Sequence, residues 1–304
     1  MSGHPSDLPP LEYATPRFQH RIEWIAFRGM GMVFHLLPRV LIKLLLQGLI
    51  VIAKFSFRKR IAPTLITIQD RLQVSKERAA SILDESLLHF GWNWVSLIRP
   101  EVFIRPGKIH IHGQEYLDQN RNNGKGTIIA TMHLGLWEAV PHAMKAFNNP
   151  LAITVAVQHN PLVDRHINKM RAAEGYHHVL HNRLGIRHTL RYLKKGGSLV
   201  IVSDVDIGPG GVPIPFLGKP ASTPKWPMEL ALRTESEILI GHSVLDKNNE
   251  LHIYISPLPS GDNETMALGQ RMNDKMSEIV RAHPEQWFWM QRRWKTPIEA
   301  CRNP

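Results

Sequence analysis

The sequence contains almost no cysteine, because among 304 residues only Cys301, close to the C-terminus, carries a thiol. An intrachain disulfide and a cysteine-ligated zinc site are therefore excluded, and the catalytic part is expected to face a reducing compartment. The chain also lacks internal repeats, low-complexity tracts, a Gly-x-Ser-x-Gly elbow and a His-Glu-x-x-His motif. These absences exclude a hydrolase built on that elbow and a protease built on that zinc motif.

Acidic residues are also scarce relative to basic ones, with 26 Asp and Glu against 37 Lys and Arg and a formal net charge of +11. Such an excess favours an anionic partner: nucleic acid, a phosphate-bearing lipid or an acidic carrier protein. The basic residues are scattered and no nucleic-acid recognition motif is present. We therefore expect no nucleic acid among the partners. Most of the 17 histidines are expected to lie on a solvated basic surface.

Long apolar runs are missing as well, although residues 22–57 are the most apolar part of the chain. This segment is interrupted by His35, Pro38, Arg39, Lys43 and Gln47, so it lacks the roughly 18 to 20 apolar residues of an ordinary span. We predict a flexible leader over residues 1–20, a membrane-anchoring helical region over 21–60 and a catalytic domain over 61–304. The alternative for the apolar segment is a buried helix with charges at its rim.

Beyond Pro100, short apolar runs alternate with helix-like stretches, and this pattern predicts an α/β fold with a largely parallel or mixed central sheet flanked by helices. The predicted strands are 127–132, 151–157, 198–203, 237–244 and 251–255. The predicted helices are 138–147, 162–174, 186–195 and 224–234, preceded by 62–73 and 76–98, with Ser75 as the N-cap of the latter.

The end of the first of these strands carries the clearest chemical signal, a histidine followed five positions later by an acid. On a continuous helix His133 and Glu138 would diverge, so we predict a turn at Gly135 that brings both side chains to one crevice. A carboxylate on one imidazole nitrogen would leave the other nitrogen free to accept a proton. The alternative is a strand-end histidine that hydrogen-bonds the backbone.

The string HLGLWE, residues 133–138, resembles the signature of glycerolipid acyltransferases in the form found in the bacterial lipid A late acyltransferases. Further segments are similar to that family in the same order: QHNPLVD at 158–164, Arg183 before a helix that ends LKKG, SDVDIGP at 203–209, FLGKPAST at 216–223 and HPEQWFWMQRRWKT at 283–296.

This resemblance implies acyl transfer from acyl carrier protein to a hydroxyl of a phosphorylated lipid A precursor, at the cytoplasmic face of a bacterial inner membrane, without a cofactor or metal. His133 would be the general base and Glu138 its orienting partner. The candidate substrate-binding residues are Arg183, which would stabilise an oxyanion, together with Asn160, Asp164, Asp204, Arg292 and Arg293. For Arg183 an ion pair with a surface carboxylate is the alternative. The aromatic segment before Arg292 either lines the mouth of an acyl groove or packs on the sheet.

Another chemistry remains open for the pair Asp204 and Asp206, which follows an apolar strand. An Asp-x-Asp placed in this way also suits a glycosyltransferase that holds a divalent metal ion between two carboxylates. An acyltransferase with another glycolipid as acceptor is the nearer alternative.

Overall fold

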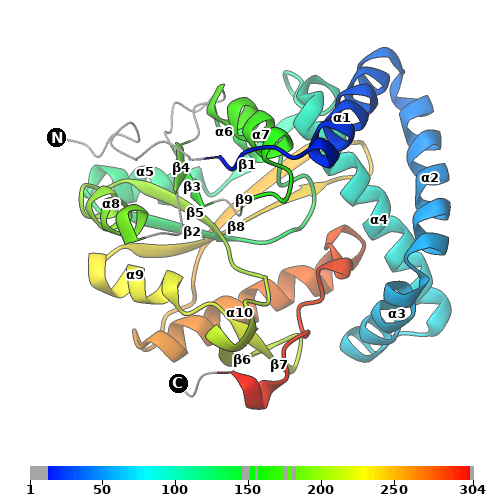
Figure 1. The fold of residues 1–304 in the computed structure, drawn as a ribbon. Helices are drawn as coiled ribbons and strands as arrows, with labels where there is room; N and C mark the ends of the chain where they lie inside the picture. Colours follow the sequence, from blue (N-terminus) through cyan, green and yellow to red (C-terminus); the bar gives the residue numbers. More distant parts are fainter. Residues whose placement is uncertain (1–12, 146–150, 155–156, 174–176, 180–182, 302–304) are drawn as a thin grey trace.

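A seven-stranded sheet forms the centre of the protein (Figure 1). The computed structural model describes residues 13–145, 151–154, 157–173, 177–179 and 183–301. The strand order is β1-β9-β8-β2-β5-β3-β4. Neighbouring strands run parallel except β8 and β9, which are antiparallel. The bounds are β1 Ile109–His112, β2 Thr127–Thr131, β3 Leu151–Thr154, β4 His177–Val179, β5 Ser198–Val202, β8 Glu237–Leu245 and β9 Leu251–Pro257.

Helices pack against both faces of this sheet, as the alternation of apolar runs predicts. Apolar residues of α5 and α6 form a core with one face of β2, and residues of α9 and α10 form the larger core with the opposite face. The bounds are α4 Lys76–Ile98, α5 Gln114–Asn122, α6 Val140–Lys145, α7 Pro161–Ala173, α8 Arg183–Lys194, α9 Trp226–Thr234 and α10 Thr265–Ala282. A separate antiparallel pair consists of β6 Val212–Phe216 and β7 Lys219–Thr223. The predicted α/β class with a mostly parallel sheet is confirmed.

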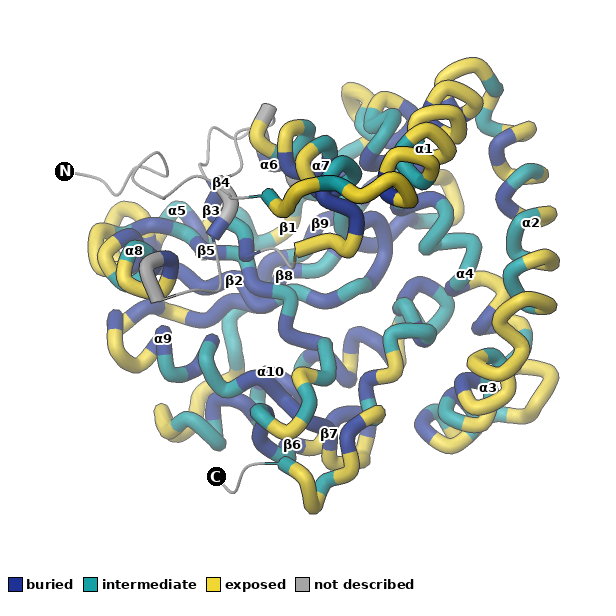
Figure 2. The backbone as a smooth tube through the Cα atoms, in the orientation of Figure 1, coloured by how far each residue is buried: buried dark blue, intermediate teal, exposed yellow. Residues whose placement is uncertain are grey.

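The apolar N-terminal segment is divided into α1 Phe18–Leu36 and α2 Arg39–Ser56, followed by α3 Arg58–Leu72. The break lies at Pro38, which forces its preceding residue out of the helical region; Leu37 is accordingly extended, with φ −87° and ψ 141°. Taken singly, none of the described helices is long and apolar enough to cross a bilayer, whereas α2 and α3, bent by 99°, pass that test only as a pair. The outer side of α2 is exposed (Figure 2).

The parallel register of β2 and β5 positions the functional residues. Thr131, the last residue of β2, pairs with Val202, the last residue of β5. His133 and Asp204 each follow two residues later, so both lie at the same edge of the sheet. Residues beyond the carboxyl ends of parallel strands are where α/β proteins usually place their sites.

Candidate active site

His133 and Asp204 form the centre of the site. The Nδ1 atom of His133 lies 2.9 Å from Asp204 Oδ1, and the His133 backbone N–H donates to Asp204 Oδ2 over 2.9 Å. Because an ionised carboxylate only accepts hydrogen bonds, Nδ1 carries the hydrogen and Nε2 keeps its lone pair. The side chain of His133 is 26% exposed, so the imidazole remains accessible. The side chain of His133 therefore bonds a carboxylate and not the backbone, which was the alternative.

Asp204 is fully buried and is held by two further donors. Trp287 Nε1 and Gln291 Nε2 donate to its Oδ2 over 2.8 and 3.0 Å. Burial alone would raise the pKa of this carboxyl, but the charge of His133 and the hydrogen bonds outweigh it and lower the pKa to about 2. For His133, burial works to lower the pKa, yet the charge and hydrogen bond of Asp204 raise it above 6.5. The pair therefore favours an ionised Asp204 and a basic imidazole.

The loop that carries His133 is fixed by distant parts of the chain. Gly135 has φ +67°, and a Cβ there would lie 2.0 Å from the Ser243 carbonyl oxygen, so glycine is required. The Gly135 N–H donates to Gln286 O over 3.0 Å, and the His133 carbonyl accepts from Phe288 N over 2.9 Å. The predicted turn at Gly135 is confirmed, and the C-terminal segment holds it in place.

Glu138 is not the hydrogen-bonding partner of His133 that the sequence predicts. Its carboxylate is held by Arg171 of α7, through Nε to Oε2 at 3.0 Å and through a second bond from the guanidinium to Oε1. Its backbone N–H donates to Asn93 Oδ1 of α4 over 2.9 Å. Asp204 thus occupies the position that we expected for Glu138. Glu138 still lies near enough for its charge to raise the pKa of His133.

An apolar cavity of about 380 Å³ adjoins His133, within the range of ~300 to 1,000 Å³ typical of ligand pockets. Its polar lining includes Glu138, Arg171 and Gln158. The remaining wall is mostly aliphatic and includes, among others, Ile129, Val140, Met144, Leu151, Ile153, Val200 and Ile255. Both Thr131 and Ile129 line it, so it runs from the strand end back along one face of β2.

Asn160 and Asp164, predicted as substrate-binding residues, form hydrogen bonds within the protein and lie away from the cavity. Asn160 Oδ1 accepts from the first backbone N–H groups of α7, and its Nδ2 donates to His20 O and Glu23 Oε2 of α1. Asp164 Oδ1 accepts from Gln158 N and Asn168 Nδ2. Both side chains are buried, and neither lines the cavity. Their hydrogen bonds join α7 to α1 and to the loop that precedes α7.

The arginines predicted to bind substrate differ in burial and in their contacts. Arg293 is 1% exposed and donates to Ser222 O and Thr223 Oγ1 over 2.6 and 2.7 Å, so it joins the C-terminal segment to β7 rather than binding substrate. Arg292 is exposed and does not line the cavity. The side chain of Arg183 lies outside the described residues. Trp287 and Trp289 are buried, which favours packing on the sheet over a membrane-facing mouth.

Asp204 and Asp206 do not form a shared metal site. Whereas Asp204 binds His133, the carboxylate of Asp206 accepts from Thr296 N, Thr296 Oγ1 and Gly208 N, over 2.6 to 2.8 Å. Within the described residues, these two carboxylates do not belong to a group of three or more ligands close enough to share an ion. Asp204 also has no exposed surface for substrate contact. The structure therefore gives the glycosyltransferase alternative no support and corrects Asp204 to a partner of His133.

Arg171 is the residue of the site that sequence reasoning missed most completely. The available signal was a row of polar residues on the predicted helix 162–174, where Asp164, Asn168 and Arg171 recur at spacings of four and three. Such a row on a helix flanked by strands indicates a polar face turned inward. Trp287 and Gln291 lie within a segment that resembles the acyltransferases, but nothing local links either of them to Asp204.

Comparison with known proteins gives matches to bacterial acyltransferases. The family model of bacterial lipid A biosynthesis acyltransferases matches residues 12–296. A phosphatidylinositol mannoside acyltransferase of Mycobacterium tuberculosis (strain CDC 1551 / Oshkosh) is 24% identical over 234 residues, 72% of each chain. One of the same name from strain ATCC 25618 / H37Rv is 24% identical over 199 residues, 64% of this chain and 62% of the relative. The chain therefore belongs to the bacterial lipid A biosynthesis acyltransferase family and is an O-acyltransferase.

Proposed function

We propose that this acyltransferase moves a fatty acyl chain from acyl carrier protein to a hydroxyl of a lipid A precursor, with His133 as general base. The observation that carries the proposal is the imidazole itself, whose Nδ1 is occupied by Asp204 while the side chain lines an apolar cavity. An imidazole with a free nitrogen beside an apolar space supports its role as proton acceptor in acyl transfer.

In the proposed reaction, Nε2 of His133 removes the proton from the acceptor hydroxyl as the oxygen attacks the thioester carbonyl carbon. The tetrahedral intermediate then collapses, the carbon–sulfur bond breaks and the thiolate leaves. His133 returns its proton to the sulfur, so the imidazole is neutral again. Asp204 holds the tautomer and stabilises the imidazolium between these steps. No acyl-enzyme intermediate is required.

The pH dependence of kcat/KM follows from the charge of Asp204. A base must be unprotonated, and Asp204 raises the pKa of His133 above its usual 6.5. Activity should therefore fall as the pH decreases through a midpoint above 6.5, since protons bind the imidazole more tightly than in a free histidine. Initial rates at low substrate concentration between pH 5 and 9 measure this limb. A midpoint at or below about 6.5 would contradict the assignment.

The cavity along β2 is proposed to hold the acyl chain of the donor, because branched aliphatic side chains form most of its wall. Burying methylene groups there contributes about 0.8 kcal/mol each. The polar end formed by Glu138 and Arg171 adjoins His133, where the thioester would lie. The length of the apolar space would then determine which chains fit.

An Ile153→Phe substitution, which fills part of this cavity, is expected to shift the preferred acyl chain to a shorter one. The rate ratio of long to short donors should fall by about 10-fold, because a few poorly accommodated methylene groups cost 1 to 3 kcal/mol. Competition between two labelled acyl donors measures the ratio. Ile186→Phe, the same change on the exposed face of α8, is the control. An unchanged ratio would exclude this cavity as the acyl site.

Two glycolipids are candidates for the acceptor. The two relatives are named for a phosphatidylinositol mannoside, whereas the family model is named for lipid A. Both acceptors are anionic glycolipids with free hydroxyls, which the net charge of +11 would attract. Mass spectrometry of membrane lipids from cells with the intact protein or with a His133→Ala variant distinguishes them, since only the true product loses one acyl group. Purified acyl carrier protein and coenzyme A thioesters can be compared as donors in the same assay.

We further propose that α1 and α2 hold the enzyme on the cytoplasmic face of the inner membrane. Large apolar side chains are exposed along α2, including Val40, Leu44, Val51 and Phe55. An apolar hollow of about 560 Å³ lies between α1, α2 and α4, where an acyl chain of the acceptor would fit. Lys43 is exposed on the same helix and would contact lipid phosphates, whereas Lys54 is paired with Asp84 of α4 over 2.6 Å.

Replacing Val51 and Phe55 by Glu should release the protein from anionic vesicles, because two charges would enter the apolar surface that contacts lipid. Flotation with vesicles is expected to show at least a 10-fold loss of the bound fraction, measured as a partition coefficient. Ile186→Glu on α8 is the control for added negative charge. Equal flotation of the double variant and the unmodified protein would contradict the anchor.

A further inference from the structure

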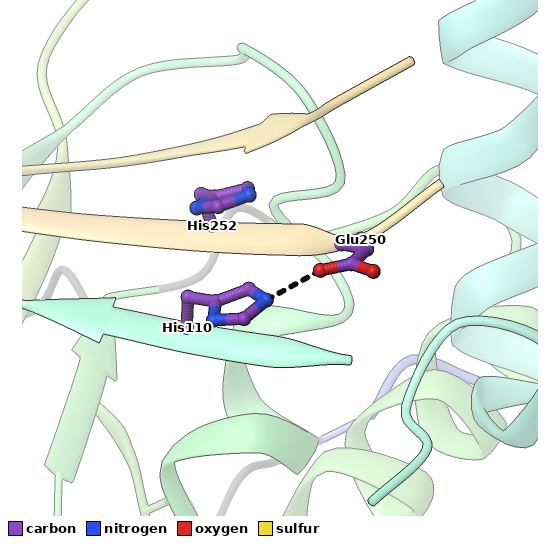
Figure 3. Close-up of side chains that lie close together, drawn as sticks. All are labelled: His110, Glu250 and His252. Atoms are coloured by element: carbon purple, nitrogen blue, oxygen red, sulfur yellow. Dashed lines mark hydrogen bonds and ion pairs between the residues drawn. The ribbon is translucent and has the colours of Figure 1, made fainter. Parts of the chain in front are cut away.

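Two histidines and a glutamate meet at the edge of the sheet farthest from β4, on β1 and at the start of β9 (Figure 3). One ligand atom each from His110, Glu250 and His252 lie within 4.8 Å of one another. His110 Nε2 is 2.6 Å from Glu250 Oε2. All three side chains are partly exposed, at 38%, 20% and 22% in that order. A small cation could therefore reach them from solvent.

The strand register explains why these side chains meet. His110 of β1 pairs directly with His252 of β9 in the parallel ladder. Glu250 precedes His252 by two residues, which places both side chains on the same face of the chain. Asp246, at the start of the β8–β9 connection, accepts from the Glu250 N–H over 2.7 Å and donates its own N–H to the Glu250 carbonyl oxygen over 3.0 Å. The position of Glu250 is therefore fixed by the backbone.

Neighbouring groups orient these ligands in the manner of partners around a metal site. The Nδ1 atom of His252 is 3.2 Å from His112 Nε2, and when Nδ1 donates this bond, Nε2 of His252 keeps its lone pair. That Nε2 lies 3.9 Å from Asp246 Oδ2, which also accepts from Asn248 Nδ2 over 3.3 Å. Lys108 binds Oε1 of Glu250 and leaves Oε2 for other partners.

We propose that His110, His252 and Glu250 bind a divalent ion of the zinc type, with the fourth position open to water. Two imidazole nitrogens with carboxylate oxygens are ligands that Zn²⁺ accepts in a tetrahedral arrangement at about 2.0 to 2.2 Å. The alternative to a metal ion is a set of ion pairs, which join Glu250 to Lys108 and His110 and join His252 to Asp246.

The ion would act as a structural clamp. Within the described sheet β1 is an edge strand that pairs only with β9, and the proposed ligands join these two strands. His110 and His252 lie on the face opposite Ile253 and Ile255, the residues of β9 that line the acyl cavity. The site therefore takes no part in the proposed proton transfer, and its test is independent of that proposal.

The test uses the full chain, freed of metal by chelation and dialysis, and titrated with Zn²⁺ alone by calorimetry and with Co²⁺ by visible absorption. We expect one site of defined stoichiometry, tetrahedral Co²⁺ bands and a rise in melting temperature with Zn²⁺. His252→Ala should weaken Zn²⁺ binding by more than about 10-fold, since even outer partners of metal sites have effects of 10- to 100-fold. Glu250→Gln, which keeps the shape of the side chain, provides a second variant should His252→Ala fold poorly.

Because the chain has 17 histidines, weak binding elsewhere must be separated from this site. His35→Ala, the loss of an exposed histidine on α1, is the matched control and should leave affinity and stoichiometry unchanged. Wild-type Zn²⁺ affinity in folded His252→Ala or in Glu250→Gln would overturn the proposal. So would the absence of tetrahedral Co²⁺ bands from the unmodified protein.

Discussion

The kcat of an Asp204→Asn variant is expected to be lower by a factor of about 10³ to 10⁴, while the fold is kept. A loss of this size is known for the aspartate of a Ser-His-Asp triad when it is replaced by asparagine. The asparagine carbonyl can still accept from Trp287 Nε1 and Gln291 Nε2, which now bind Oδ2. Its amide nitrogen then faces Nδ1 of His133 as a donor. The imidazole would respond by moving its hydrogen to Nε2 and would lose the lone pair that accepts the substrate proton.

The assay for this variant follows labelled acyl groups from acyl carrier protein to lipid, with circular dichroism and thermal melting as checks on the fold. Asp262→Asn, the same chemical change at an exposed position, should retain full activity. A folded Asp204→Asn protein within about 3-fold of normal turnover would show that the tautomer of His133 does not depend on Asp204.

Replacing His133 by Ala is expected to lower kcat by about 10² to 10⁴, the usual contribution of a positioned proton acceptor. The hydroxyl would then have to transfer its proton to water. KM should change less, because the apolar walls of the cavity remain. Asp204 keeps its bonds from Trp287 and Gln291, so its charge is still partly compensated.

His35→Ala, a change at an exposed histidine of α1, controls for the loss of one imidazole and should be fully active. Near-normal acyl transfer by folded His133→Ala would refute the general-base mechanism. A parallel loss of melting temperature and activity would show a structural effect, and His133→Gln, which retains a hydrogen-bonding side chain, then separates the two causes.

Much of the fold could be predicted because its signals are local. The helix over 76–98 has exactly its predicted bounds, since Ser75 accepts a hydrogen bond from the Arg78 N–H as an N-cap should. The apolar runs 127–132 and 198–203 correspond closely to β2 and β5, and the turn at Gly135 uses a φ of +67°, which glycine adopts without strain. The strands β1, β4, β6 and β7 and the helices α5 and α10 are not predicted from the sequence. In β1 the reason is that the strand has only four residues and alternates histidine with isoleucine.

The partner of His133 could not be predicted from spacing because the decisive contact is long-range. Glu138 is five residues away and Asp204 is 71, yet the parallel register of β2 and β5 brings Asp204 to the imidazole. The sequence placed both residues at strand ends, and only the strand order shows that these ends are adjacent. Arg171 then accounts for the carboxylate of Glu138, which no local pattern indicated.

The kinetic coupling of His133 and Asp204 tests the central claim most directly. If Asp204 acts only through the imidazole, the double variant His133→Ala/Asp204→Asn should turn over as slowly as His133→Ala alone, because residues that act as a unit have non-additive effects. The measurement is kcat for the four members of the cycle, with the same labelled donor and lipid. Losses that multiply, so that the double variant falls to the product of the two single effects, would contradict the account.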